Sequence, residues 1–81
     1  MKQWCVTHVD ERQDKPYVNG PFSSYDLACA WAGRFAQHKA TEYGMKLEGE
    51  NDYFAIMTDS EEMPECVAEI SVIELIPPHV E

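Results

Sequence analysis

Only one stretch of this 81-residue chain has helical periodicity, and sequence typical of β-strands lies on both sides of it. Residues 25–39 (YDLACAWAGRFAQHK) are rich in alanine. Larger side chains recur there at the spacing of one helix face: Leu27, Trp31, Phe35 and His38. Ala28 and Ala32 flank this stripe and would allow the helix to pack closely on a sheet. The segment therefore predicts one amphipathic helix over about residues 24–41, ending between residues 41 and 44.

The start of this helix carries local signals of its own. Asn19-Gly20-Pro21 interrupts the chain, and Ser23 then stands where an N-cap is expected. Asp26, three residues later, makes a variant of the capping box, while Phe22 and Leu27 occupy the two positions of a hydrophobic staple. These signals predict an N-cap at Ser23.

Strand-like segments account for most of the remaining chain. Residues 2–9 alternate with period two, and residues 16–18 return after a polar loop, which predicts an antiparallel hairpin. After the helix, strands are expected at three further places: residues 45–48, 53–58 and 66–76. A turn is expected at residues 49–52 and an acidic connection at 59–65. The order β-β-α-β-β-β predicts a single α+β domain over residues 1–81, with the helix on one face of a mostly antiparallel sheet of four to five strands.

One helix covers only one face of such a sheet. Residues 53–57 and 67–76 are apolar at both odd and even positions, which indicates a second buried or contact face. A homodimer or a bound partner would supply that cover, and the long segment 66–76 could also pair across a sheet edge.

Positive charge ends at Lys46. Residues 1–46 hold six Lys or Arg against five acids, whereas residues 47–81 hold ten acids and no Lys or Arg, within a formal net charge of −9. Charge asymmetry of this kind informs on partners and solubility rather than on fold. Nucleic acid is a disfavoured partner, because its phosphates would be repelled.

We expect part of this acidic half to form a binding surface. In a strand, alternate side chains point the same way, so Glu48, Glu50 and Asp52 would form a ladder. The predicted partner-binding residues are Glu48, Glu50, Asp52, Tyr53, Asp59, Glu61, Glu62 and Glu65. Their expected partner is a basic, nucleic-acid-handling protein. Two alternatives stay open: the acids serve only solubility, or the oxygens at residues 48–52 and 59–62 bind a divalent ion, although neither segment matches an EF-hand.

Catalytic and cofactor signatures are absent from the sequence. It has no nucleophile elbow, phosphate-binding glycine loop or dinucleotide fingerprint, so we expect no enzyme, no catalytic residue and no cofactor. Cys5 and His8 have C-x-x-H spacing, but residues three apart in a strand face opposite sides, which argues against a shared zinc ion. Cys29, His38, Cys66 and His79 are the other residues that could in principle join such a site. Buried free cysteine is the preferred interpretation.

Compartment follows from what the sequence does not carry. Residues 1–15 contain no apolar run, so we expect no signal peptide and no membrane span. Three scattered cysteines suit a reducing environment better than a disulfide framework. The expected location is the cytoplasm, or the host cytoplasm for a viral protein.

Two resemblances bear on function. Residues 18–35 (VNGPFSSYDLACAWAGRF) resemble the turn and Ala-rich helix of SPOR domains, which bind peptidoglycan outside the membrane. We recognise no membrane anchor in the sequence, and no second βαβ half follows the segment. We therefore interpret this similarity as shared turn-to-helix chemistry. The overall profile resembles small acidic phage-encoded inhibitors: host-takeover proteins, anti-CRISPR proteins and DNA mimics. That resemblance implies a non-enzymatic inhibitor of a basic host protein. The alternatives are a small self-associating structural or regulatory domain and a divalent-metal binder.

Overall fold

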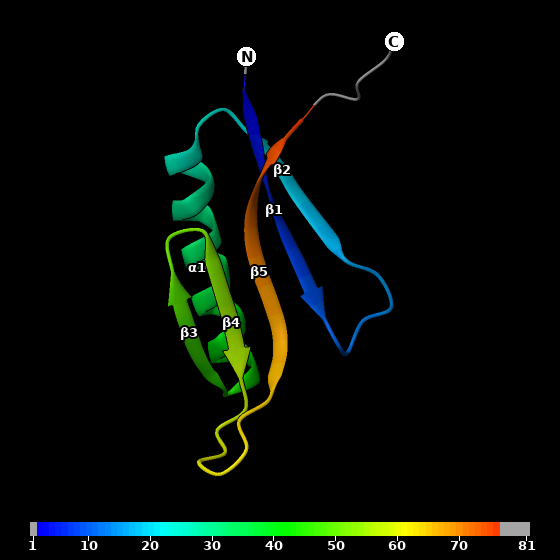
Figure 1. Ribbon diagram of the computed structural model, residues 1–81, viewed down its shortest axis with the longest axis vertical. Helices are drawn as coiled ribbons and strands as arrows, with labels where there is room; N and C mark the ends of the chain where they lie inside the picture. The colour runs from blue at the N-terminus through cyan, green and yellow to red at the C-terminus, as the bar shows by residue number, and fades with distance from the viewer. Residues whose placement is uncertain (1, 77–81) are drawn as a thin grey trace.

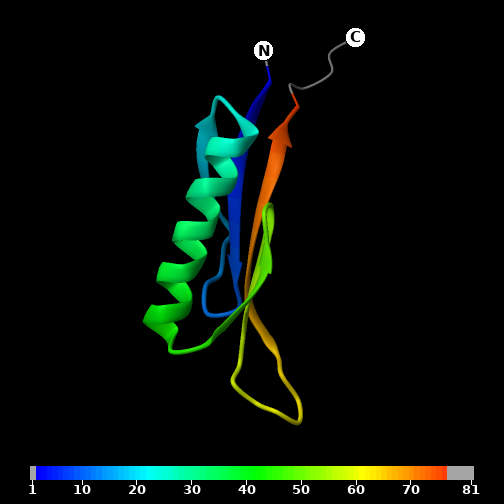
Figure 2. The ribbon, with the colours of Figure 1, turned by 90° about the vertical axis from the view of Figure 1, so that its left-hand side faces the viewer.

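A five-stranded antiparallel sheet carries a single helix on one of its faces in the computed structural model, which describes residues 2–76 (Figure 1). The elements follow in the order β1 (Gln3–Asp10), β2 (Tyr17–Phe22), α1 (Tyr25–Tyr43), β3 (Lys46–Glu50), β4 (Tyr53–Met57) and β5 (Cys66–Leu75). Figure 2 shows the two layers edge-on, with α1 on one side of the sheet only. The predicted α+β architecture and the β-β-α-β-β-β order are confirmed.

The last strand lies in the middle of the sheet. The strand order is β2-β1-β5-β4-β3, and β5 pairs with both β1 and β4. The expectation that residues 66–76 pair across an open edge was therefore wrong. Both sides of β5 are occupied by strands of the same chain, and the two edges are β2 and β3. The central strand joins the first and last parts of the chain, so the fold depends on contacts that are distant in sequence.

The helix begins one residue later than its local signals predict. Ser24, not Ser23, is the N-cap, and its Oγ accepts a hydrogen bond from the amide of Leu27 at 3.0 Å. Leu27 is 57% exposed and does not serve as half of a staple with Phe22. Phe22 instead packs against Trp31, with ring centroids 5.7 Å apart. At the other end, Gly44 adopts a left-handed φ of 66° and caps the helix, within the predicted range.

Alanines form the centre of the buried helix face. Ala28, Ala32, Ala36 and Ala40 are buried against the sheet. The predicted stripe of Leu27, Trp31, Phe35 and His38 was therefore wrong in phase. Trp31 and Phe35 are half-buried and stack on each other at the side of the helix, and His38 is exposed. Because alanine has no bulk beyond Cβ, the helix backbone approaches the sheet closely and the larger rings are placed beside the contact.

Strand alternation separates two sets of buried side chains. The helix-facing set contains Val6, Phe54, Ile56, Ala68 and Ile70, which pack with the helix alanines. Cys5, Ala55 and Val67 are also buried but belong to the opposite face of the sheet and do not join this core. Cys5 and His8 thus point to opposite sides, as the strand geometry predicts.

A buried carboxylate ties β1 to the end of α1. Asp10 is 4% exposed and accepts hydrogen bonds from the Tyr43 hydroxyl and from the backbone amide of Arg12. Burial opposes ionisation of Asp10, but these two bonds and nearby positive charge together lower its pKa. The hydrogen bond to Asp10 raises the pKa of Tyr43 to about 12. The guanidinium of Arg12 also lies over the Tyr43 ring, 4.5 Å from its centroid.

The β3–β4 hairpin is tighter than predicted. Strand β3 continues to Glu50, so the turn contains only Asn51 and Asp52 rather than residues 49–52. Gly49 lies within the strand at φ 101°, and a Cβ there would stand 2.2 Å from the carbonyl oxygen of Tyr53. Only glycine fits this position. The hairpin therefore places Glu48 and Glu50 on a strand, not in a loop.

Within residues 2–76, no helix has both the length and the apolar character needed to cross a membrane.

Candidate functional site

The sheet face turned away from α1 carries three of the eight predicted residues, Glu48, Glu50 and Tyr53; we call it the open face (Figure 2). Strand register assigns its residues, because paired residues share a face. One row across the sheet contains Glu48, Ala55, Glu69 and Val9. The next row contains Glu50, Tyr53, Ser71 and Thr7. Three carboxylates, those of Glu48, Glu50 and Glu69, are therefore exposed on one face.

Glu69 is a site residue that the sequence-based prediction missed. It accepts a hydrogen bond from the Tyr53 hydroxyl at 2.9 Å, and this bond raises the pKa of Tyr53. Period-two alternation within residues 66–75 places Glu69 on one face of a strand, but the sequence does not show which strand lies beside it. The pairing of β5 with β4 is what brings Glu69 next to Tyr53.

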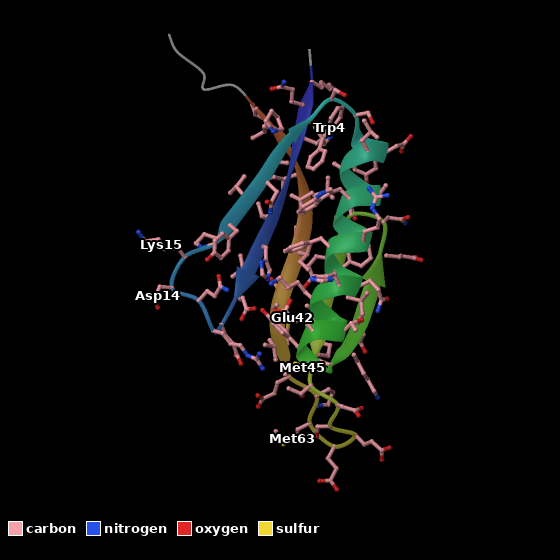
Figure 3. All side chains as sticks on the ribbon, turned by 180° about the vertical axis from the view of Figure 1, so that it is seen from behind. Trp4, Asp14, Lys15, Glu42, Met45 and Met63 are labelled. Atoms are coloured by element: carbon pink, nitrogen blue, oxygen red, sulfur yellow. The ribbon has the colours of Figure 1, made fainter. Side chains whose placement is uncertain are left out.

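The acidic connection between β4 and β5 extends beyond the sheet and helix at one end of the molecule (Figure 1). It carries four of the predicted residues, all exposed: Asp59, Glu61, Glu62 and Glu65. Two hydrogen bonds close its base: the Thr58 amide donates to the Glu65 carbonyl oxygen, and the Glu65 amide donates to the Thr58 hydroxyl. Met63, at its tip, is 74% exposed (Figure 3). We call residues 59–65 the acidic loop.

One acid of this loop is already neutralised. The Nζ of Lys46 lies 3.2 Å from Oδ1 of Asp59. Among the strand residues that the structure describes on the open face, Lys46 is the only base. The open face and the acidic loop thus adjoin each other through this ion pair, and the other carboxylates there have no basic partner within ion-pair distance in residues 2–76.

Asp52 does not join this surface, so the predicted ladder of Glu48, Glu50 and Asp52 is only partly formed. Asp52 lies in the turn, and its backbone oxygen accepts a hydrogen bond from the amide of Val72. Its side chain interacts with Tyr25 of α1. The pKa of the Tyr25 hydroxyl is raised, first by its hydrogen bond with Cys29 and second by its hydrogen bond with Asp52. The turn ends the strand alternation, and Asp52 consequently faces the helix layer.

Apolar side chains surround the carboxylates on the open face. Val9 and Tyr53 stand in the two rows that carry the acids, and Ile73 and Leu75 follow along β5. Each of these four is exposed by at least 40%. Such a mixture of anionic and apolar groups provides both charge and contact area for a partner.

Potential metal ligands and cysteines are scattered over the described residues. In residues 2–76 no three His, Cys, Asp or Glu side chains gather closely enough to hold a metal ion. His79, one of the candidate ligands from the sequence, lies outside the described residues. The three cysteines are free, but the expectation that they are buried was wrong for Cys66, which is exposed, and Cys29 is only half-buried. Cys5 is buried, which raises the pKa of its thiol.

Comparisons with protein-family models, with curated proteins and with solved structures found no match to this chain.

Proposed function

We propose that this chain is a non-enzymatic binding protein that inhibits a basic, nucleic-acid-handling protein by covering the partner's cationic site. The observation that carries the proposal is the open face. It displays the carboxylates of Glu48, Glu50 and Glu69 among exposed apolar side chains, and its one base is paired with the adjoining acidic loop. Acids that served only solubility would have no reason to share a face with exposed Tyr53 and Ile73.

Charge and apolar area would contribute differently to binding. The carboxylates would steer encounter with a cationic surface and fix its orientation, and this contribution weakens as salt is added. Tyr53 would supply buried contact, since tyrosine is enriched among residues that dominate binding energy. The acidic loop would extend the anionic surface beyond the end of the sheet.

Inhibition follows from competition. A basic groove that binds phosphates cannot hold a nucleic acid while an anionic protein surface occupies it. The proposed setting is the cytoplasm, or the host cytoplasm if the protein is viral, where a phage or mobile-element inhibitor of host or defence enzymes would act. Free thiols at Cys29 and Cys66 are compatible with that reducing environment.

The test is affinity capture from a lysate of the native host, followed by direct binding with the captured protein. We expect association that weakens steeply with salt and is abolished by the double variant Glu48→Lys/Glu50→Lys. The matched control is Asp14→Lys/Glu42→Lys, which makes the same change in net charge on exposed residues away from the open face (Figure 3). Equal loss in both variants, or binding that is insensitive to salt, would contradict the proposal.

A second function has one observation in its favour. Val9, Ile73 and Leu75 leave apolar area exposed on the open face, which a second copy of the chain could cover. A self-associating structural or regulatory domain would then need no basic partner. Sedimentation of the wild-type protein and of Ile73→Glu distinguishes the two: a dimer that this substitution dissociates supports self-association, and a monomer supports the inhibitor.

A further inference from the structure

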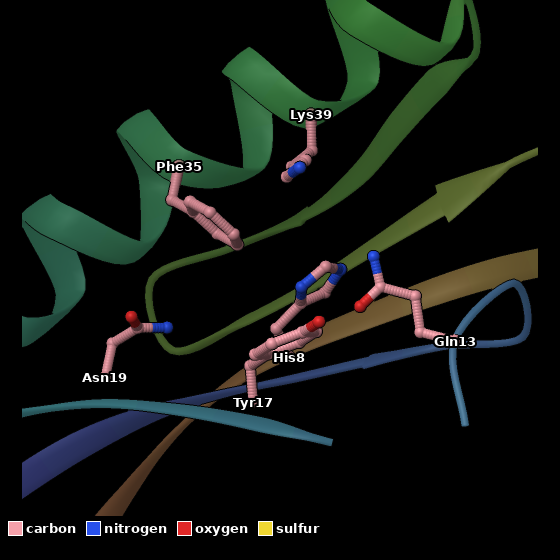
Figure 4. Close-up of a pocket in the computed structure, with 6 residues that line it drawn as sticks. All are labelled: His8, Gln13, Tyr17, Asn19, Phe35 and Lys39. Carbon is pink, nitrogen blue, oxygen red and sulfur yellow. The ribbon is translucent and has the colours of Figure 1, made fainter. Parts of the chain in front are cut away.

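A cavity of about 280 Å³ opens between α1 and the β1–β2 hairpin, on the side of the sheet opposite to the open face (Figure 4). Its lining comes from four parts of the chain: His8 of β1, Gln13 of the connecting loop, Tyr17 and Asn19 of β2, and Phe35 and Lys39 of α1. The volume is just below the range of about 300–1,000 Å³ typical of ligand pockets, which limits the occupant to a small molecule.

The cavity contains a buried polar group without a partner. The side chain of His8 is 2% exposed, and its Nε2 is the one buried side-chain nitrogen or oxygen in residues 2–76 that makes no hydrogen bond. Oδ2 of Asp10 stands 3.7 Å from this nitrogen, which is too far for a hydrogen bond, and it already accepts one from Tyr43. Buried polar groups in folded proteins are nearly always satisfied, so this exception needs an explanation, and a group bound in the adjoining cavity would supply one.

Burial also fixes the charge state of this imidazole. Loss of solvation is the main cause that lowers the pKa of His8, and the nearby ammonium of Lys39 adds to it, while Asp10 opposes it. His8 is therefore neutral at physiological pH and has one donor and one acceptor nitrogen. A hydroxyl group can both donate and accept, so it suits the ring in either tautomer.

The aromatic residues that line the cavity suit a ligand with an aromatic ring. The His8 ring is stacked on Tyr17, with centroids 6.1 Å apart, and meets the edge of Phe35 at 5.1 Å. These rings form walls for an aromatic ligand. Figure 4 shows Gln13 beside the edge of the His8 imidazole. Because Gln13 is exposed and belongs to a loop, its side chain can move away to admit a ligand.

Lys39 supplies the charge. Its side chain is 22% exposed, and its ammonium stands 5.8 Å from the Phe35 ring centroid. None of the six lining residues is acidic. Glu42, whose carboxylate lies 3.5 Å from the ammonium, does not line the cavity, so an anion bound there would share Lys39 with it.

We propose that this cavity binds a small hydroxyaromatic carboxylate, with the carboxylate on Lys39, the ring against Tyr17 and Phe35, and the hydroxyl hydrogen-bonded to the His8 imidazole. The site is separate from the proposed inhibitor surface.

The test is titration of the isotope-labelled protein with 4-hydroxybenzoate, benzoate and phenol, followed through the amide resonances of Tyr17, Asn19 and Phe35 and the ring nitrogens of His8. We expect millimolar or tighter binding of 4-hydroxybenzoate, and binding at least about tenfold weaker for the two compounds that lack either polar group. Lys39→Met should weaken 4-hydroxybenzoate about tenfold and leave phenol unchanged. His8→Phe should remove the preference for 4-hydroxybenzoate over benzoate.

The matched control is Arg34→Met, which removes the same charge from an exposed position on α1 outside the cavity. It should bind 4-hydroxybenzoate as the wild type does. The proposal is overturned if none of the three probes moves the cavity resonances of the wild-type protein. It is equally overturned if Arg34→Met weakens binding as much as Lys39→Met, because the effect would then be one of net charge.

Discussion

The helix covers one face of the sheet and leaves the other exposed, although the same strands build both faces. On β5, Ile70 faces the helix and is completely buried, whereas Ile73, three residues further on, belongs to the open face and is 46% exposed. Ionisable groups differ in the same way. Asp10 is buried on the covered face with its oxygens bonded, and Glu48, Glu50 and Glu69 stand exposed on the other.

From this contrast we expect residues on the covered face to determine stability and residues on the open face to determine binding. The covered face holds the alanines of α1 and the core residues of three strands, so changes there should affect folding. The carboxylates of the open face are exposed and stand beside exposed apolar side chains, so changes to them should affect binding. Substitutions of the same residue type on the two faces test this division directly.

The largest difference is expected between two isoleucines of one strand. Ile70→Ala should lower the free energy of unfolding by roughly 2–5 kcal/mol, because it opens a cavity in the core. Ile73→Ala should cost less than about 1 kcal/mol, since half of that side chain already meets water. Urea denaturation of both variants measures the two values. Similar losses would show that the open face is covered in solution.

A smaller difference is expected between two tyrosine–carboxylate hydrogen bonds. Tyr43→Phe should cost about 1–3 kcal/mol, because buried Asp10 loses a donor. Tyr53→Phe removes the same kind of bond to Glu69, but on an exposed surface, and should change stability by no more than about 0.5 kcal/mol. Thermal and urea unfolding of the two variants provide the comparison. The reverse order would contradict the assignment of faces.

The helix cap gives a third test, because Ser24 and not its neighbour Ser23 caps α1. Ser24→Ala should cost about 0.5–2 kcal/mol through loss of the bond to the Leu27 amide. Ser23→Ala, next to it, should stay within about 0.5 kcal/mol. If Ser23→Ala proves the more harmful, the helix begins where the local signals predict.

Acidification should weaken the covered face through His8. Burial lowers the pKa of His8 from its usual 6.5, so below that value the unfolded chain takes up a proton that the folded chain resists. This contribution to stability is present above about pH 6.5 and is lost as the pH falls further towards the lowered value. Asp10, whose pKa is lowered from 3.8, adds a loss at still lower pH.

The measurement is the unfolding free energy of the wild type minus that of His8→Phe, from about pH 7.5 to pH 5. Subtraction removes the effect of the many carboxylates that both proteins share. We expect the difference to fall on acidification, and a difference that is constant or rises would contradict the neutral, buried state of His8.

The helix and strands of this fold could be predicted because the signals for each lie within a few consecutive residues. Alternation at residues 2–9 marks β1, and the alanine-rich segment and Gly44 mark α1 and its end. The phase of the helix was missed because size was taken as the sign of burial, whereas the smallest side chains allow the closest packing. The central place of β5 was missed because neither of its neighbours is close to it in sequence.

The candidate site was predicted in part for the same reason. Glu48, Glu50 and Tyr53 share a face because they belong to one hairpin, which the sequence shows. Glu69 reaches them only through strand pairing, and Asp52 leaves them at the turn. The cavity at His8 was not predicted, because it needs β1, β2 and α1 together.

The most direct test of the central claim is carbodiimide footprinting of carboxylates in the complex with the captured basic partner. Reaction of the free protein and of the complex, with modified residues located by mass spectrometry, reports on each acid separately. The account predicts that Glu48, Glu50 and Glu69 lose reactivity on binding while Asp14 and Glu42 keep theirs. Protection of Asp14 and Glu42 with the open face still reactive would contradict it.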